Sequence, residues 1–483
     1  MLGDKHIFKN TPPCSYMLFA SNFSMIHTHQ GHLPYKMAQL HTTFSLTLDH
    51  VDALETVFTL LRHHSHKHDD YYAYERGEFW HMGLGSQATL LIDSQGQTAA
   101  ICADGKREIR LVNGRSLADI AREFISQYSK PSGKIYGQAG FNYAAHIRGQ
   151  VYNPGQWPLL SLMVPRSEVT IHRNYITVVG HDEYHIRELC YMLKATARVD
   201  TPRFLQDDMK QNTDDYKSMV ARALLEIAED QYTKVIVSRA VDLKDEIDMP
   251  ATLLWGRRGN TPARTFSLSH EGFEATGFSP ELVMSLENRK VVTEPLAGTR
   301  SRIGTDFEVE QRRRELLSDS KEIVEHIISV KEAVQELTGL CQRGSVIIED
   351  LMSVRERGSV QHLGSRVSGN LSPRKDGWDA FDVLFPAITA SGIPKASALS
   401  AIQRLEGQPR ELYSGAILFL EGTEIFEATL VLRTVFQDQT RRWIQVGAGI
   451  IAQSNPDREM VETSEKLESI APFLVAKDIN SML

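Results

Sequence analysis

Residues 447–470, with the sequence GAGIIAQSNPDREMVETSEKLESI, constrain the fold more than any other stretch. An apolar run reaches a predicted Gly-Ala-Gly turn, Ser-Asn-Pro-Asp interrupts the chain, and a helix follows. Because an α-helix repeats every 3.6 residues, Glu459, Glu462 and Lys466 lie on one face of it. Neighbouring carboxylates repel each other unless a cation or water separates them. The pattern therefore indicates either a solvated charged face, which is the ordinary case, or a cation site.

A second acidic pair favours the cation site. Within the charged helical region at 306–339, the segment KEIVEH places Glu322 and Glu325 three residues apart and therefore on one face. Four glutamates on two helices, with no cysteine or histidine cluster beside them, suit a hard cation bound through oxygen. Mg²⁺ is the natural candidate, because it takes few carboxylates and leaves positions for an anionic substrate. If the pairs face solvent, this interpretation fails.

The order of the predicted elements indicates an α+β fold. Short β-rich runs separated by Gly and Pro dominate residues 71–200, and EVTIHRNYITVVG has the pattern of a hairpin. A polar run at 201–213 precedes a helix and the strand KVIVSRAV, and a β meander occupies 412–451. We therefore expect three parts: an N-terminal extension at 1–38, a β-rich half at 39–213 and a second half at 214–483.

The composition excludes several classes of protein. A formal net charge of −8 argues against a nucleic-acid-binding surface. No run of about 18 apolar residues occurs, and the N-terminus lacks an apolar core behind a basic start, so we expect neither a membrane span nor a secretory signal. We expect a cytoplasmic protein, because its cysteines are scattered without CxxC spacing. They are Cys14, Cys102, Cys190 and Cys341.

Two other patterns are set aside. The histidines at 63, 64, 66 and 68, next to Asp69 and Asp70, could bind a transition metal, but an exposed loop is the favoured interpretation. Gly83-Leu84-Gly85 resembles a dinucleotide-binding loop. It lacks the third glycine and is followed by a strand, so we reject it.

Several further residues are candidates for a binding site. Tyr413 and Arg433 are expected on the strands of the C-terminal meander, where an inward-facing arginine needs an anion. Gly298-Thr299 ends another strand and could face a ligand through its backbone and hydroxyl. Lys234, at the start of KVIVSRAV, is by default an ordinary solvated lysine.

About 250 residues, from Lys234 to the C-terminus, resemble the chorismate-utilising enzymes, which include anthranilate, aminodeoxychorismate, isochorismate and salicylate synthases. The blocks that carry the resemblance are KVIVSRAV, GFSPELV, EPLAGTR, KEIVEH, QHLGSRVSG, FPAITASGIPKA, LYSGAI, TLVLRTV, GAGIIAQSNPDRE and ETSEKL. The segments DSKEIVEHIISV and VRERGSVQHLGS are most similar in sequence to the salicylate synthases of siderophore pathways. The resemblance implies two intertwined subdomains with large, mainly antiparallel sheets flanked by helices, and an active site in the cleft between them.

The resemblance also implies roles for residues. Members of the family bind one Mg²⁺ between the ring carboxylate of chorismate and acidic side chains that match Glu325, Glu459 and Glu462, with Glu322 nearby. Lys234 matches a general base that activates water to attack C2 of the ring, and burial would favour the neutral amine that this role needs. Glu281 matches the general acid that protonates the departing C4 hydroxyl, if its surroundings keep it protonated.

The remaining matches concern substrate binding. Tyr413 and Arg433 match the pair that holds the enolpyruvyl carboxylate, and Lys466 matches a lysine near the metal. His362 matches a histidine near the ring in lyase-type members, although a neutral core histidine bonded to backbone is an equal alternative. The groups around the ring and side chain match Gly298, Thr299, Thr389, Gly447, Ala448 and Gly449.

The function implied is that of a Mg²⁺-dependent salicylate synthase, which converts chorismate through isochorismate to salicylate and pyruvate. An isochorismate synthase that stops after the first stage is the alternative. Anthranilate or aminodeoxychorismate synthesis is disfavoured, because the amine-forming members carry a different residue in place of Lys234. We expect a monomer or homodimer that binds chorismate and has no amidotransferase partner. A catalytically silent protein of this fold would lack one or more of these residues, and all are present.

Overall fold

The computed structural model describes residues 42–47, 52–173, 175–180, 182–193 and 201–477. These described residues belong to one compact unit. The predicted N-terminal extension at 1–38 lies outside the described residues. No helix in the described part of the chain is long and apolar enough to cross a membrane.

The strands form one hydrogen-bonded network in which every pairing is antiparallel, and two long strands at its centre pair with each other. These are β3 (Phe79–Ile92) and β7 (Leu160–His172). Two arms leave this pair. The first continues from β3 through β2 (Tyr71–Arg76), β10 (Arg264–His270), β11 (Phe273–Ser279), β20 (Thr434–Gln437), β21 (Arg442–Ile450), β9 (Lys234–Asp242) and β17 (Gly392–Ile393).

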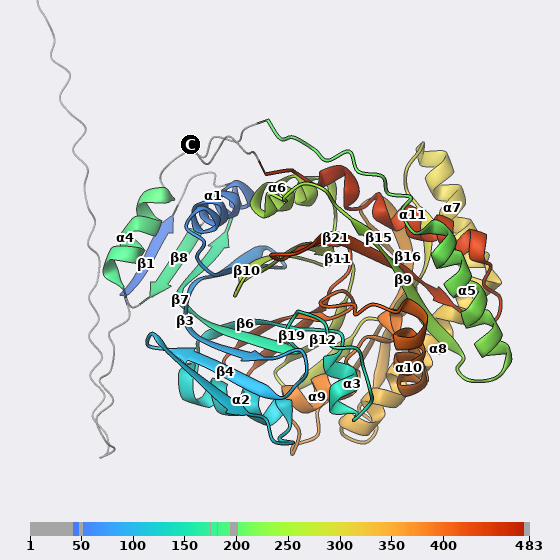
Figure 1. The fold of residues 1–483 in the computed structure, drawn as a ribbon, viewed down its shortest axis with the longest axis horizontal. Coiled ribbons are helices and arrows are strands. Elements are labelled where there is room, and N and C mark those ends of the chain that lie inside the picture. The colour runs from blue at the N-terminus through green and yellow to red at the C-terminus, as the bar shows by residue number, and fades with distance from the viewer. Residues whose placement is uncertain (1–41, 48–51, 174, 181, 194–200, 478–483) are drawn as a thin grey trace, which may run out of the picture. The chain divides into compact units, whose positions relative to one another are not determined.

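The second arm leaves β7 and faces the first (Figure 1). It runs through β6 (Lys134–Ala139), β18 (Ala416–Glu421), β19 (Ile425–Leu430), β12 (Leu282–Glu287), β13 (Lys290–Thr293) and β16 (Val360–Asn370), which also pairs with β14 (Leu296–Ser301) and β15 (Ile347–Arg357). Two short extensions complete the network. β4 (Thr98–Ala103) pairs with β3 and then with β5 (Lys106–Leu111), and β8 (Tyr175–Gly180) pairs with β7 and then with β1 (Thr42–Thr47).

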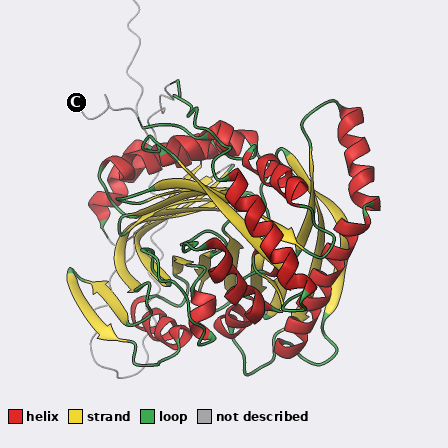
Figure 2. Ribbon diagram, turned by 45° about the vertical axis from the view of Figure 1, so that its right-hand side comes forward, coloured by secondary structure: helices red, strands yellow, loops and turns green. Residues whose placement is uncertain are grey.

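Helices cover the outer sides of both arms (Figure 2). Over the first arm lie α1 (Ala53–His66), α5 (Thr213–Ala228), α6 (Met249–Gly259) and α11 (Pro456–Leu467). Over the second lie α2 (Leu117–Tyr128), α7 (Asp306–Ser318), α8 (Ser320–Leu340) and α9 (Gly377–Leu384). The others are α3 (Tyr143–Ile147), α4 (Glu183–Met192), α10 (Lys395–Glu406) and the 3₁₀ turns η1 (Ile388–Ala390) and η2 (Ala471–Phe473).

An aromatic core joins the inner faces of the two arms. Tyr74 of β2 in the first arm stacks on Phe419 of β18 in the second, with ring centroids 5.3 Å apart. Within the first arm, Phe436 of β20 stacks on Trp443 of β21. All four side chains are buried. Large aromatic rings fill the space between the sheets well, since each buries a wide apolar area. The packing fixes the two arms relative to each other and therefore fixes any site between them.

The structure agrees with most predicted elements, including the β7–β8 hairpin, the helix at 214 and the C-terminal meander, and it corrects three. The predicted Gly-Ala-Gly turn at 447–449 is wrong, because these residues continue β21 and pair with β9. Tyr413 and Arg433 lie in connections rather than on strands. The histidine tract is not a loop: α1 extends to His66, and buried His64 bonds to the carbonyl of Leu60.

The two predicted halves share their sheets. Strand β2 pairs with β10, and β6 pairs with β18, so hydrogen bonds join segments on both sides of residue 213. The boundary between residues 39–213 and 214–483 therefore stays a prediction from the sequence, and the sheets continue across it.

A buried carboxylate ties the arms together and allows a test of the fold. Glu427 on β19 accepts hydrogen bonds from Tyr74 (2.8 Å) and from Arg76 and Arg264 (3.0 and 2.8 Å at Oε1). Burial alone would raise the pKa of Glu427, but the bond from Arg264 and the two arginine charges outweigh it and lower the pKa to about 2. The group is therefore ionised and fully paired at neutral pH.

Replacing Glu427 with glutamine is expected to destabilise the protein by about 3–5 kcal/mol, because it leaves two partly buried arginines without their anion. The melting temperature measures the effect. Glu424→Gln, at an exposed position in the same hairpin, serves as the control. Equal melting temperatures for the two variants would contradict the structural role of Glu427.

Candidate functional site

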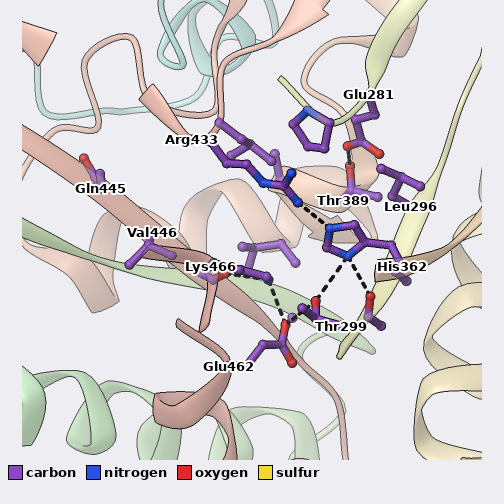
Figure 3. A pocket seen from close by; sticks show the side chains of 18 of the residues that line it. Glu281, Leu296, Thr299, His362, Thr389, Arg433, Gln445, Val446, Glu462 and Lys466 are labelled. Atoms are coloured by element: carbon purple, nitrogen blue, oxygen red, sulfur yellow. Dashed lines mark hydrogen bonds and ion pairs between the residues drawn. The ribbon is translucent and has the colours of Figure 1, made fainter. Parts of the chain in front are cut away.

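A pocket opens between the ends of the two arms and encloses about 780 Å³ of space, including solvent at its mouth. Strands β9 and β21 of the first arm, β14 and β16 of the second, and helices α8 and α11 supply its walls (Figure 3). The predicted site residues that line it are Glu281, Gly298, Thr299, Glu325, His362, Thr389, Tyr413, Arg433, Gly447, Gly449, Glu462 and Lys466. Lys234, Glu322, Ala448 and Glu459 do not line it, and all four are buried.

The glycines of β21 are needed for space and not for a turn. A side chain at Gly449 would collide with the carboxylate of Glu325 and lie 3.1 Å from Cε of Lys234. A side chain at Gly447 would lie 2.6 Å from the carbonyl of Val237 and 3.1 Å from the hydroxyl of Tyr413. The lack of a side chain at Gly449 therefore lets the Glu325 carboxylate of helix α8 lie directly against strand β21 at the pocket floor.

Lys234 is fully buried at the start of β9, so its reading as a solvated lysine is wrong. Its Nζ lies 3.0 Å from Oε1 of Glu325 and donates to the hydroxyl of Ser329 at 3.1 Å. Both partners come from α8, one turn apart, so one helix face holds the amine in place. Lys234 sits directly behind Glu325 at the pocket wall.

Glu281 follows β11 and is also buried. Its Oε1 accepts a hydrogen bond from the hydroxyl of Thr389, and its Oε2 has no hydrogen-bond partner. Burial, with a contribution from the charge of Glu294, raises the pKa of Glu281 to about 8. A carboxyl group that is protonated at neutral pH and aimed at a pocket can donate a proton there.

His362 on β16 is held as a neutral ring. Its Nδ1 lies 2.9 Å from the carbonyl oxygen of Gly298, so Nδ1 carries the hydrogen, and Nε2 accepts a bond from Arg433 (Figure 3). Burial, and next the charge of Arg433, lowers the pKa of His362 well below its ordinary value. This geometry agrees with the backbone-bonded alternative and leaves the ring as a support for Arg433.

Arg433 faces the pocket without a carboxylate of its own. It has a left-handed backbone, with φ of 52°, and Nη1 donates to the carbonyl of Arg357 at 3.1 Å. Burial and then the charge of Arg357 lower the pKa of Arg433 to about 9. Since no carboxylate of the described residues forms an ion pair with it, Arg433 can take an anionic ligand.

The two acidic pairs, from α8 and α11, converge. Lys321 Nζ lies 3.2 Å from Glu325, 3.3 Å from Glu459 and 3.8 Å from Glu322, while Glu462 pairs with Lys466 at 2.7 Å. All four carboxylates are buried. The solvated-face interpretation of α11 is therefore wrong.

The charge states within this acidic cluster differ. Burial would raise the pKa of Glu462, but Lys466 and Lys321 outweigh it and lower the pKa to about 2. Burial and the neighbouring Glu462 raise the pKa of Glu459 to about 7. Both oxygens of Glu459 lack a hydrogen-bond partner, as does Oε2 of Glu322.

Buried carboxylate oxygens without donors fit a hard cation. Glu325, Glu459 and Glu462 offer oxygen ligands only, which is the donor set that Mg²⁺ prefers. As they stand, no His, Cys, Asp and Glu side chains of the described residues are grouped tightly enough to hold a metal ion. The ammonium of Lys321 lies 3.2 Å from Glu325 and 3.3 Å from Glu459. Glu322 is already bound by Arg300 at 3.0 Å and Arg458 at 3.2 Å.

Three of the cations around this cluster, Lys321, Arg300 and Arg458, are not among the residues predicted from the sequence. Lys321 lies one helical turn before Glu325, and this i,i+4 spacing was a usable signal. Arg300 directly follows Thr299, and its position on β14 gives no sign of the helix it contacts.

Comparison with known proteins gives one family match and several relatives. A family model described as chorismate binding enzyme matches residues 68–472. The salicylate synthase of Mycolicibacterium paratuberculosis is 38% identical over 416 residues, which cover 85% of this chain and 90% of that protein. The anthranilate synthase component 1 of Methanothermobacter thermautotrophicus is 31% identical over 360 residues, which cover 72% and 77%.

Solved structures with a similar backbone include two from bacteria. The menaquinone-specific isochorismate synthase of Escherichia coli has a TM-score of 0.69 at 20% identity, and the match covers 90% of this chain and 95% of that one. The anthranilate synthase component I of Streptococcus pneumoniae has a TM-score of 0.70 at 23% identity, covering 82% and 92%. At these identities the likeness establishes the fold and not the reaction.

Proposed function

We propose that this chain, which belongs to the chorismate binding enzyme family, is a Mg²⁺-dependent salicylate synthase that converts chorismate through isochorismate to salicylate and pyruvate. The family and the predicted fold are confirmed by the family match and the structural neighbours. The observation that carries the proposal is a buried, protonated Glu281 that lines the pocket, together with a buried lysine, Lys234, directly behind the pocket-lining Glu325. This pair has the chemistry that replacing one hydroxyl by another requires.

In the first stage water adds at C2 of the ring and the C4 hydroxyl leaves. Lys234, acting as the free amine and not as the ammonium that pairs with Glu325, takes a proton from the water as the new C2–O bond forms. The ring double bonds shift, the C4–O bond breaks, and Glu281 gives its proton to the departing oxygen, which leaves as water. One proton is taken up and one is released, so the step is balanced.

In the second stage the C2 hydrogen moves to the methylene carbon of the enolpyruvyl group and the C3–O bond breaks. Pyruvate departs, and the remaining ring becomes aromatic. This rearrangement needs positioning more than acid–base help. Arg433 and Tyr413 would hold the side-chain carboxylate, and neutral His362 would orient Arg433 through Nε2.

Mg²⁺, held by Glu325, Glu459 and Glu462, would neutralise the ring carboxylate of the substrate. Lys466 donates to the carbonyl of Gly447 at 2.9 Å and pairs with Glu462, so it would keep that carboxylate aimed at the cluster. Glu322, bound by two arginines, would stand outside the direct ligands.

The test is to identify products. The purified protein is incubated with chorismate, with Mg²⁺ or with EDTA, and with or without ammonium, and the mixture is separated by chromatography. We expect salicylate and pyruvate in equal amounts with Mg²⁺ and neither with EDTA. Isochorismate alone would mean that the enzyme stops after the first stage, and anthranilate would mean that ammonia is the nucleophile. A siderophore pathway, a cytoplasmic location, a monomer or homodimer and the lack of an amidotransferase partner stay predictions.

A further inference from the structure

Lys321 occupies the centre of the acidic cluster. Its side chain is 12% exposed, and its Nζ lies within 4 Å of carboxylate oxygens of Glu325, Glu459 and Glu322. No hydrogen bond of good geometry holds the ammonium to one of them. It is therefore shared between two helices by charge rather than fixed to a single partner.

Each carboxylate of the cluster has a cationic partner, but they are not equivalent. Glu325 also pairs with Lys234, and Glu462 pairs with Lys466. Glu322 is held by Arg300 and Arg458. Among the described residues, Glu459 forms an ion pair with Lys321 only, at 3.3 Å. Without Lys321, the fully buried Glu459 would keep no cation beside it.

We infer that Lys321 is an internal cation that holds the acidic cluster together in the metal-free protein and is displaced when a divalent cation binds there. The inference rests on the proposed Mg²⁺ site. A single positive charge balances the cluster less strongly than a divalent ion, so the ion can take its place. The displaced ammonium of Lys321 moves toward Glu322, whose Oε1 lies 3.8 Å away and whose Oε2 has no hydrogen-bond partner.

This arrangement has two measurable consequences. Lys321 stabilises the metal-free protein, because it prevents repulsion between α8 and α11. It also lowers the affinity for the metal, because the ion must displace it. Lys321 is thus a positioning residue for the proposed metal ligands. The same side chain raises the stability of the metal-free protein and lowers its affinity for the metal.

The experiment compares wild type with Lys321→Met by thermal unfolding at pH 8, in EDTA and across a MgCl₂ titration. We expect Lys321→Met to melt at a lower temperature in EDTA and to reach half of its Mg²⁺-induced rise at a roughly tenfold lower Mg²⁺ concentration. Lys331→Met, at an exposed position on the same helix, should match wild type in both. A variant that folds only in the presence of Mg²⁺ would also support the inference.

Lys321→Arg separates charge from packing. It keeps the positive charge, so we expect its melting temperature in EDTA and its half-saturating Mg²⁺ concentration to stay close to those of wild type. Unchanged metal affinity in Lys321→Met, or an arginine variant as unstable in EDTA as the methionine one, would overturn the inference and leave the proposed Mg²⁺ site intact. If Mg²⁺ does not raise the melting temperature of wild type or support its activity, the proposed metal site itself is wrong.

Discussion

Replacing Lys234 with alanine is expected to slow the conversion of chorismate to isochorismate by roughly 10²- to 10⁴-fold, the usual range for loss of a general base. Release of pyruvate from supplied isochorismate should stay within about tenfold of wild type, because that step moves a hydrogen within the substrate and needs no base. Chromatography of the products from each substrate measures the two rates separately.

The control is Lys244→Ala, at an exposed position just beyond β9, which should leave both rates unchanged. If Lys234→Ala loses both activities equally, with an unchanged melting temperature, the lysine serves substrate binding and is not a base for the first stage. If the rate of chorismate conversion survives, Lys234 is not the base that activates the water.

The sequence predicts the members of the site better than their arrangement. Helical spacing puts Glu459 beside Glu462, and Glu322 beside Glu325, without any knowledge of the fold. Spacing within one helix cannot show that α8 and α11 meet, because that contact depends on how β14 and β21 carry them to the same pocket. Charged helical residues are usually solvated, so burial of this cluster could come only from tertiary structure or from the family resemblance.

The errors share a physical cause. The Gly-Ala-Gly pattern at 447–449 predicts a turn, since glycine favours turns, whereas in the structure Gly449 makes room for the carboxylate of Glu325 and Gly447 for the hydroxyl of Tyr413. Lys321 was missed for the matching reason. A lysine in a polar helix has the pattern of a surface residue, and only the position of α11 turns it into the partner of Glu459.

The surroundings of Glu281 link the fold to the chemistry. Its position between the arms excludes water, and Glu294 adds a nearby negative charge, so the proton is kept to about pH 8. Lys234 on β9 is the cation that opposes this effect, and Thr389 stabilises the ionised form through its hydroxyl. An acid with this pKa is poised for proton donation at physiological pH.

Glu281→Gln is accordingly expected to lower kcat for isochorismate formation by roughly 10²- to 10⁴-fold and to remove the alkaline limb of the pH profile. A general acid works in its protonated form, so wild-type kcat/KM should hold below the pKa of about 8 and fall as the pH rises through it. Glutamine occupies the same space and has no proton to lose, so the residual activity should not fall there.

Glu294→Gln provides the matched variant, because it removes the charge that helps to raise the pKa of Glu281 without touching the carboxyl group itself. In Glu294→Gln the fall of kcat/KM with rising pH should begin at a lower pH, while the activity near pH 6 stays close to that of wild type. Rates are measured as isochorismate and salicylate formed between pH 6 and pH 10 at saturating Mg²⁺. An alkaline limb that persists unchanged in Glu281→Gln would show that another group donates the proton, and the buried carboxyl would then serve only to place Thr389.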